Sequence, residues 1–97
     1  MISKQIKKQF KNFPELIQIV DRQEAKGKAT YGSTLDHNNA DVKERVNHAL
    51  EEIIDAMMYM QWISETQQGL NKQLVDTDIK ILSSIAVGVY RIGKGGF

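Results

Sequence analysis

The fold of this chain is decided by the stretch ERVNHALEEIIDAMMYMQW, which runs from Glu44 to Trp62. Residues three and four apart share one face of an α-helix. At that spacing, one side of the stretch collects apolar residues: Val46, Leu50, Ile53, Met57 and Met60. The other side collects acidic and aromatic residues: Glu44, His48, Glu51, Asp55, Tyr59 and Trp62, with Glu52 at its edge. The stretch therefore predicts one long helix with two separate faces.

The acidic side of this helix has no basic residue to balance it. From Val46 to Trp62 the chain contains neither lysine nor arginine. Carboxylates at helical spacing without a neighbouring cation suit a divalent metal ion. A solvated acidic face has the same pattern, so the spacing alone leaves both interpretations open.

The composition is that of an ordinary globular protein of one domain. The chain has 97 residues, 41% apolar and 26% charged, and a net charge of +1 that gives no general attraction for nucleic acid. It has no cysteine, which excludes disulfides and thiolate metal sites. We find neither a signal peptide nor a long apolar run, and therefore expect a cytoplasmic protein without a membrane partner. A core this small favours a homo-oligomer.

The pattern along the chain predicts an all-α fold, a small bundle of about four helices completed by oligomerisation. Helices are expected over residues 1–12, 14–26, 41–68 and 76–92, with a loop at 27–40 and a tail at 93–97. In the first of them, Ile2, Ile6 and Phe10 form an apolar face, and Leu16, Ile17 and Val20 are expected to point inward from the second. We interpret the four lysines of the first helix as a solvated face, and a nucleic-acid partner is not expected.

Local signals place the ends of the predicted helices. Pro14 suits a first helical turn, and Gly27 is expected to end the second helix. Asp41 followed by Glu44 resembles a capping box, and Gly69 is expected to close the long helix.

The last helix is expected to begin near Asp76–Thr77. Gly88 lies inside it, where a glycine either weakens the helix by about 1 kcal/mol or permits close packing. The expected inward face is Ile79, Leu82, Ile85, Ala86 and Val89.

Two pairs of acids on the long helix are candidates for Mg²⁺. Glu52 and Asp55 are three residues apart, and Glu51 and Asp55 are four apart, so each pair projects from neighbouring turns. Mg²⁺ binds through one or two carboxylates and leaves its other positions to water and phosphate oxygens. His48 can orient a carboxylate or donate to a phosphate, and it can equally be a partly buried structural residue. Tyr59 and Trp62 can stack on a base or pack against another helix.

The second helix carries another acidic pair, Asp21 and Glu24. If this helix lies antiparallel to the long one, the two pairs would form a cage of carboxylates inside a bundle. Arg22, Lys26 and Lys28 would either neutralise these acids or contact phosphates beside a metal. The glycines of KGKATYGSTL permit close backbone approach, but the segment is not a Walker-type loop.

Two segments together resemble a known family. RQEAKGKATYGSTL (residues 22–35) and HALEEIIDAMMYM (residues 48–60) are similar to small, often phage-encoded, MazG-like proteins of the all-α nucleoside triphosphate pyrophosphohydrolase superfamily. The resemblance covers residues 21–62. It implies helical bundles assembled as dimers or tetramers, which bind Mg²⁺ through an ExxE and an ExxD motif. It also implies cleavage of nucleotides to monophosphate and pyrophosphate.

Carried over by position, Glu52 and Asp55 match the ExxD motif, and Asp21 with Glu24 gives DxxE where the family has ExxE. The expected catalytic acids are then Glu51 and Glu52, and the expected Mg²⁺ ligands are Glu52, Asp55, Asp21 and Glu24. The expected nucleotide-binding residues are Arg22, Lys26, Lys28, Tyr31, His48, Tyr59 and Trp62.

Three functions remain open on the sequence. The first is a Mg²⁺-dependent nucleotide pyrophosphohydrolase. The second is a phage protein, acting in the host cytoplasm, that sequesters a nucleotide immune signal as an anti-defence factor and does not cleave it. The third is a structural or protein-interaction bundle whose acids are only solvated.

Overall fold

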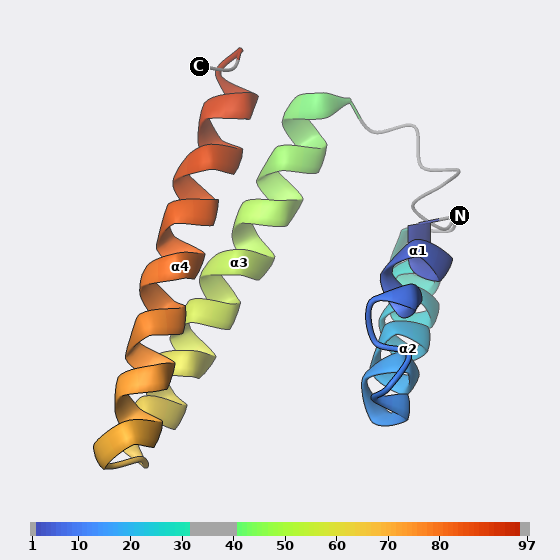
Figure 1. Cartoon of the computed structure of the whole chain (residues 1–97). Helices are drawn as coiled ribbons and strands as arrows, with labels where there is room; N and C mark the ends of the chain where they lie inside the picture. Colours follow the sequence, from blue (N-terminus) through green and yellow to red (C-terminus); the bar gives the residue numbers. More distant parts are fainter. Residues whose placement is uncertain (1, 32–40, 96–97) are drawn as a thin grey trace. The chain divides into compact units, whose positions relative to one another are not determined.

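The computed structural model describes residues 2–31 and 41–95, apart from the side chains of Thr30 and Tyr31. The described residues form four α-helices and no strand, which confirms the predicted all-α class (Figure 1). The helices are α1 (Ile2–Lys8), α2 (Pro14–Tyr31), α3 (Val42–Glu65) and α4 (Gly69–Gly93). They fall into two compact units, residues 1–39 with α1 and α2 and residues 40–97 with α3 and α4, which are described separately.

In the first unit α1 packs against α2, and Pro14 begins α2 as predicted. The predicted extent of the first helix, to residue 12, was wrong because the chain changes its hydrogen bonding after Lys8. Phe10 N donates to Lys7 O at 2.9 Å, which is the three-residue pattern of a turn. Pro14 also disfavours helical backbone at the residue before it, Phe13.

The prediction that α2 ends at Gly27 was also wrong, because α2 continues to Tyr31. A glycine that ends a helix usually adopts positive φ, whereas the described glycines with positive φ are Gly69 and Gly95. Gly27 therefore stays in helical conformation, and residues 28–31, predicted as loop, are helical. The rest of the predicted loop, residues 32–40, lies outside the described residues.

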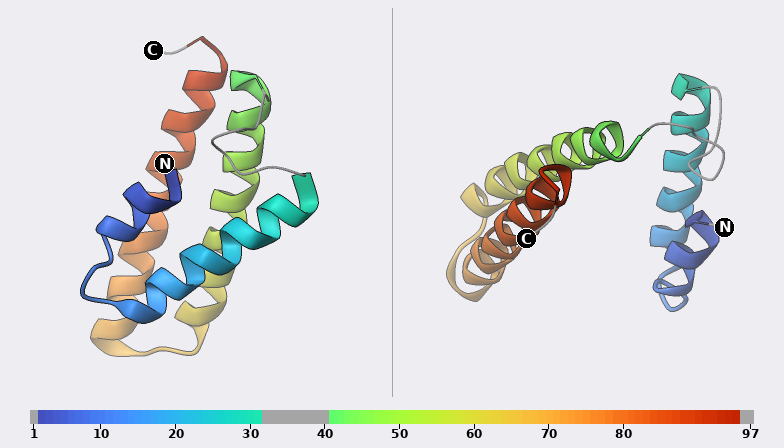
Figure 2. Two further views of the ribbon diagram at one scale, coloured as in Figure 1. Left: turned by 90° about the vertical axis from the view of Figure 1, so that its right-hand side faces the viewer. Right: turned by 90° about the horizontal axis from the view of Figure 1, so that it is seen from above.

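The second unit is a hairpin of two long antiparallel helices that lie side by side (Figure 2). Asp41 is the N-cap of α3, as predicted, and its Oδ1 accepts a hydrogen bond from Glu44 N at 2.8 Å. The predicted extension of this helix to residue 68 was wrong. Thr66 Oγ1 donates to Ile63 O at 2.7 Å, and the backbone at Gln68 is extended, so the chain turns after Glu65.

The start of α4 also differs from the prediction, since Gly69 opens this helix and does not close the previous one. Asp76 and Thr77, predicted to begin the helix, lie inside it. Their side chains make other bonds, because Asp76 accepts from Ser64 on α3 and Thr77 Oγ1 donates to Gln73 O at 2.9 Å. The predicted start of the last helix near these two residues was therefore wrong.

Packing between α3 and α4 uses the apolar face predicted for the long helix. Val46 is buried, and the rest of that face is half-buried: Leu50, Ile53, Met57 and Met60. The facing residues of α4 are half-buried as well: Ile79, Leu82, Ala86 and Val89. Ile85, predicted to belong to this set, is 46% exposed, and Leu16 of α2 is likewise exposed. At the open end of the hairpin, a Cβ added to Gly93 would lie 2.8 Å from Val46 Cγ1, so this glycine allows α4 to approach α3 closely.

Candidate functional site

The acidic stripe of α3, which we define as Glu44, His48, Glu51, Glu52, Asp55, Tyr59 and Trp62, is exposed along its whole length. It is exposed because the opposite side of α3 packs against α4. Its two aromatic members are exposed over more than half of their surface, Tyr59 at 64% and Trp62 at 67%. Large aromatic side chains usually bury their rings against a partner surface. These two rings are accordingly available to one.

Within the stripe, Glu52 and Asp55 lie three residues apart on α3, and Glu51 lies four residues from Asp55. In the described part of the chain, no lysine or arginine forms an ion pair with any of the three. Like charges on neighbouring turns destabilise a helix by a few tenths of a kcal/mol. The arrangement thus presents clustered negative charge to solvent, with no counter-ion among the residues that the structure describes.

This chemistry fits Mg²⁺ in part. Over residues 2–31 and 41–95, no three acidic or histidine side chains are grouped closely enough to hold a metal ion on their own. Two carboxylates with water and substrate phosphate completing the shell are nevertheless an ordinary Mg²⁺ arrangement. Glu52 and Asp55 therefore suit a metal that arrives with a nucleotide better than one bound permanently.

The second predicted acidic pair, Asp21 and Glu24, differs from the first because one of its carboxylates already has a lysine as ion-pair partner. Asp21 on α2 forms an ion pair with Lys7 on α1, and Glu24 is half-buried nearby on the same helix. The hydrogen bond to Asp21 raises the pKa of Lys7 above its ordinary value of 10.5, with partial desolvation acting against it and the charges of Asp21 and Glu24 adding to it. A metal at Asp21 would have to displace Lys7.

Of the predicted phosphate contacts, Arg22, Lys26 and Lys28 are all exposed on α2. The side chain of Tyr31 and the whole of residues 32–40 lie outside the described part of the chain. The convergence of the acids of α2 on those of α3 remains a prediction, because the two helices belong to separate units.

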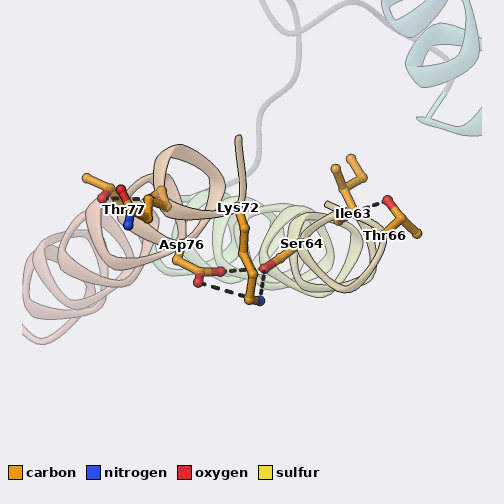
Figure 3. A network of polar contacts seen from close by, with 7 residues as sticks. Ile63, Ser64, Thr66, Lys72, Asp76 and Thr77 are labelled. Atoms are coloured by element: carbon orange, nitrogen blue, oxygen red, sulfur yellow. Dashed lines mark hydrogen bonds and ion pairs between the residues drawn. The ribbon is translucent and has the colours of Figure 1, made fainter. Parts of the chain in front are cut away.

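One polar cluster was not predicted from the sequence. Ser64, the described side chain with no exposed surface, donates from Oγ to Asp76 Oδ1 at 2.5 Å (Figure 3). Lys72 Nζ donates to Ser64 Oγ at 2.9 Å and lies 3.6 Å from Asp76 Oδ2. The cluster joins the end of α3 to the first turns of α4. Asp76 lies 12 positions after Ser64, and Lys72 lies 8 positions after it. The sequence did not predict these contacts, because residues 69–75 were expected to connect the two helices and not to form the first turns of α4.

Comparison of the chain with protein-family models, with characterised proteins and with solved structures found no match. Among the described residues, no helix is both long and apolar enough to cross a membrane.

Proposed function

We propose that this protein is a MazG-like, Mg²⁺-dependent nucleotide pyrophosphohydrolase that releases a monophosphate and pyrophosphate. The observation that carries the proposal is the exposed Glu52–Asp55 pair, which has ExxD spacing and no ion-pair partner in the described part of the chain. The resemblance of residues 21–62 to that superfamily supplies the reaction. It also implies assembly of the chain as a dimer or tetramer.

In this proposal Glu52 and Asp55 hold Mg²⁺, which when bound neutralises phosphate charge and favours attack by water. Glu51, on the same exposed face, accepts the proton of that water. Tyr59 and Trp62 stack on the base, since both rings are exposed one to two turns further along α3.

His48, on the same face of α3, is the phosphate donor in this proposal. The donors expected on α2 from the resemblance stay a prediction: Arg22, Lys26, Lys28 and Tyr31. Cleavage consumes one water across the bond between the α- and β-phosphates. The oxygen of the water stays on the monophosphate.

The experiment is incubation with a panel of nucleoside triphosphates and Mg²⁺, followed by chromatography of the products. Glu52→Gln with Asp55→Asn should abolish release of monophosphate, because two ligands lose their charge. Glu65→Gln is the matched control, since Glu65 is an exposed acid on the same helix outside the acidic stripe. No monophosphate from any nucleotide, with protein shown to be folded, would refute turnover.

A second function is favoured by the state of Asp21. Its ion pair with Lys7 leaves Glu52 and Asp55 as the acids ready to receive a metal. If only Glu52 and Asp55 bind the metal, the protein would hold a nucleotide without cleaving it. A phage protein that sequesters a nucleotide immune signal would act in this way.

Native mass spectrometry separates these two functions. After prolonged incubation with Mg²⁺ and nucleotide, intact ligand on the protein supports sequestration, and product supports cleavage. If neither ligand nor product appears, and the double substitution alters only stability, the acidic stripe is a solvated face of a structural bundle.

A further inference from the structure

Helix α4 carries a second apolar face that α3 does not cover. Five large side chains on it are about half exposed: Leu70 69%, Leu74 55%, Ile81 52%, Ile85 46% and Ile92 52%. Intervals of four and seven residues place them along one side of a helix. We call these five residues the outer stripe. Single exposed apolar residues are common on protein surfaces, whereas a continuous row of them along a helix marks a contact surface.

No charged residue belongs to the outer stripe, and Thr77 and Gly88 are positions at helical spacing between its members. Thr77 lies in the interval between Leu74 and Ile81, and its hydroxyl donates to Gln73 O of the same helix at 2.9 Å. That hydrogen is therefore already bonded, and Thr77 places little desolvation cost on a partner.

Gly88 is the second observation, and it is independent of exposure. It lies on the same side of α4, three residues after Ile85 and four before Ile92, and a Cβ added to it would meet nothing within 4 Å. Gly93, in contrast, is explained by Val46 of α3. Glycine inside a helix is unfavourable relative to alanine, and one use of it is to let another backbone or side chain come close. No neighbour in the described part of the chain accounts for Gly88.

The order of residues along the outer stripe suits a second copy of the same helix. If two α4 helices pack antiparallel with Ile81 at the two-fold axis, Leu70 faces Ile92 of the other copy. Leu74 then faces Gly88 of the other copy, so that a large residue meets the one position without a side chain. A contact of this kind is self-complementary, as two-fold interfaces are.

The size of the outer stripe is sufficient for such a contact. Five half-exposed side chains supply on the order of 500 Å² per copy, or about 1,000 Å² for a pair, which reaches the lower limit for a specific interface.

We propose that the outer stripe of α4 binds the outer stripe of a second copy, antiparallel about Ile81 and with Leu74 of each copy over Gly88 of the other. The proposal goes beyond the nucleotide chemistry and does not depend on it. It predicts a symmetric dimer even for a protein that binds no nucleotide.

The first test is sedimentation velocity of the full chain without nucleotide. Wild type should sediment as a dimer, and Ile81→Lys should sediment as a monomer with unchanged helicity by circular dichroism. Val87→Lys is the matched control, because Val87 is 47% exposed on the same helix but outside the outer stripe. A monomeric wild type, as expected if the first unit of the same chain covers the stripe, would overturn the proposal. Equal dissociation by both substitutions would do the same.

The second test uses the absence of cysteine in the chain, which makes a single introduced thiol unique. Ile81→Cys keeps an apolar side chain and should form a disulfide-linked dimer in high yield under mild oxidation. Leu74→Cys should not, because the two copies of Leu74 lie far apart in an antiparallel pair. Crosslinking of Leu74→Cys without Ile81→Cys would exclude this register even where Ile81→Lys fails to fold.

Discussion

At the scale of single residues, the polar side chains of this protein have two different roles. Ser64, Lys72 and Asp76 bond to one another and fix the turn between α3 and α4. Glu51, Glu52 and the rest of the acidic stripe face solvent. Residues whose bonds are satisfied within the chain contribute to stability, whereas exposed like charges are a small cost. That cost is what makes the stripe a candidate for function.

We expect Asp76→Asn to lower the free energy of unfolding by about 1 kcal/mol. The substitution removes the charge that Ser64 and Lys72 bond to across the turn. Urea unfolding followed by circular dichroism measures the change. Asp78→Asn is the control, because Asp78 is exposed on the same helix, and an equal loss in both variants would contradict the assigned role of Asp76.

Lys7 gives a prediction about pH. Its pKa is raised in the folded chain, chiefly by the hydrogen bond to Asp21, so the pair stabilises the fold fully below pH 10.5. The contribution is then lost as the pH rises through the raised pKa of folded Lys7. We expect Asp21→Asn to lower this pKa in an NMR titration of the lysine side chains, and Glu24→Gln to lower it less. A larger effect of Glu24→Gln would show that the long-range charge dominates over the hydrogen bond.

At the scale of helices, glycine has opposite meanings at different positions. Gly27 continues α2, Gly69 begins α4 with a φ of 60°, and Gly93 makes room for Val46. Sequence signals for helix ends treat glycine as a stop. The backbone conformation, which depends on the residues that follow, decides which role applies.

The contrast between two of these glycines can be measured. Gly27→Ala should raise the free energy of unfolding by about 1 kcal/mol, because Gly27 is helical and its Cβ position is open. Gly69→Ala should lower it by about 1 kcal/mol, because positive φ strains any residue with a Cβ. Thermal unfolding of both variants checks the pair. A stabilising Gly69→Ala would mean that the turn at residues 66–68 adopts another conformation.

At the scale of the whole molecule, each of the two units, taken by itself, leaves much of its described apolar surface exposed. Val46 is the buried apolar residue of the described part, while large side chains such as Trp62 and Leu70 are more than half exposed. A domain of this length normally buries well over half of the surface of its unfolded chain. Further packing would bury this exposed apolar surface, and the outer stripe of α4 is our proposal for part of that packing.

If a second copy supplies that packing, stability depends on protein concentration. The midpoint of thermal unfolding should rise with concentration for wild type, by mass action, and should stay constant for Ile81→Lys. Differential scanning calorimetry over a wide range of concentrations tests this. A midpoint independent of concentration in wild type would place the source of stability within one chain.

Much of this structure follows from the sequence. The all-α class, the start of α2 at Pro14, the cap at Asp41 and the two faces of α3 depend on bonds and periodicities within a few residues, which the sequence contains in full. The lengths of α2 and α4 were misjudged, because Gly27, Gly69 and Asp76–Thr77 carry signals that mark a helix end only when the neighbouring backbone agrees. Tertiary structure alone decided three features. They are the cluster of Ser64 with Lys72 and Asp76, the close approach of Gly93 to Val46, and the absence of any described neighbour at the Cβ position of Gly88. They require α3 and α4 to meet in one register, and that register is set by the turn at residues 66–68, which no local pattern had revealed.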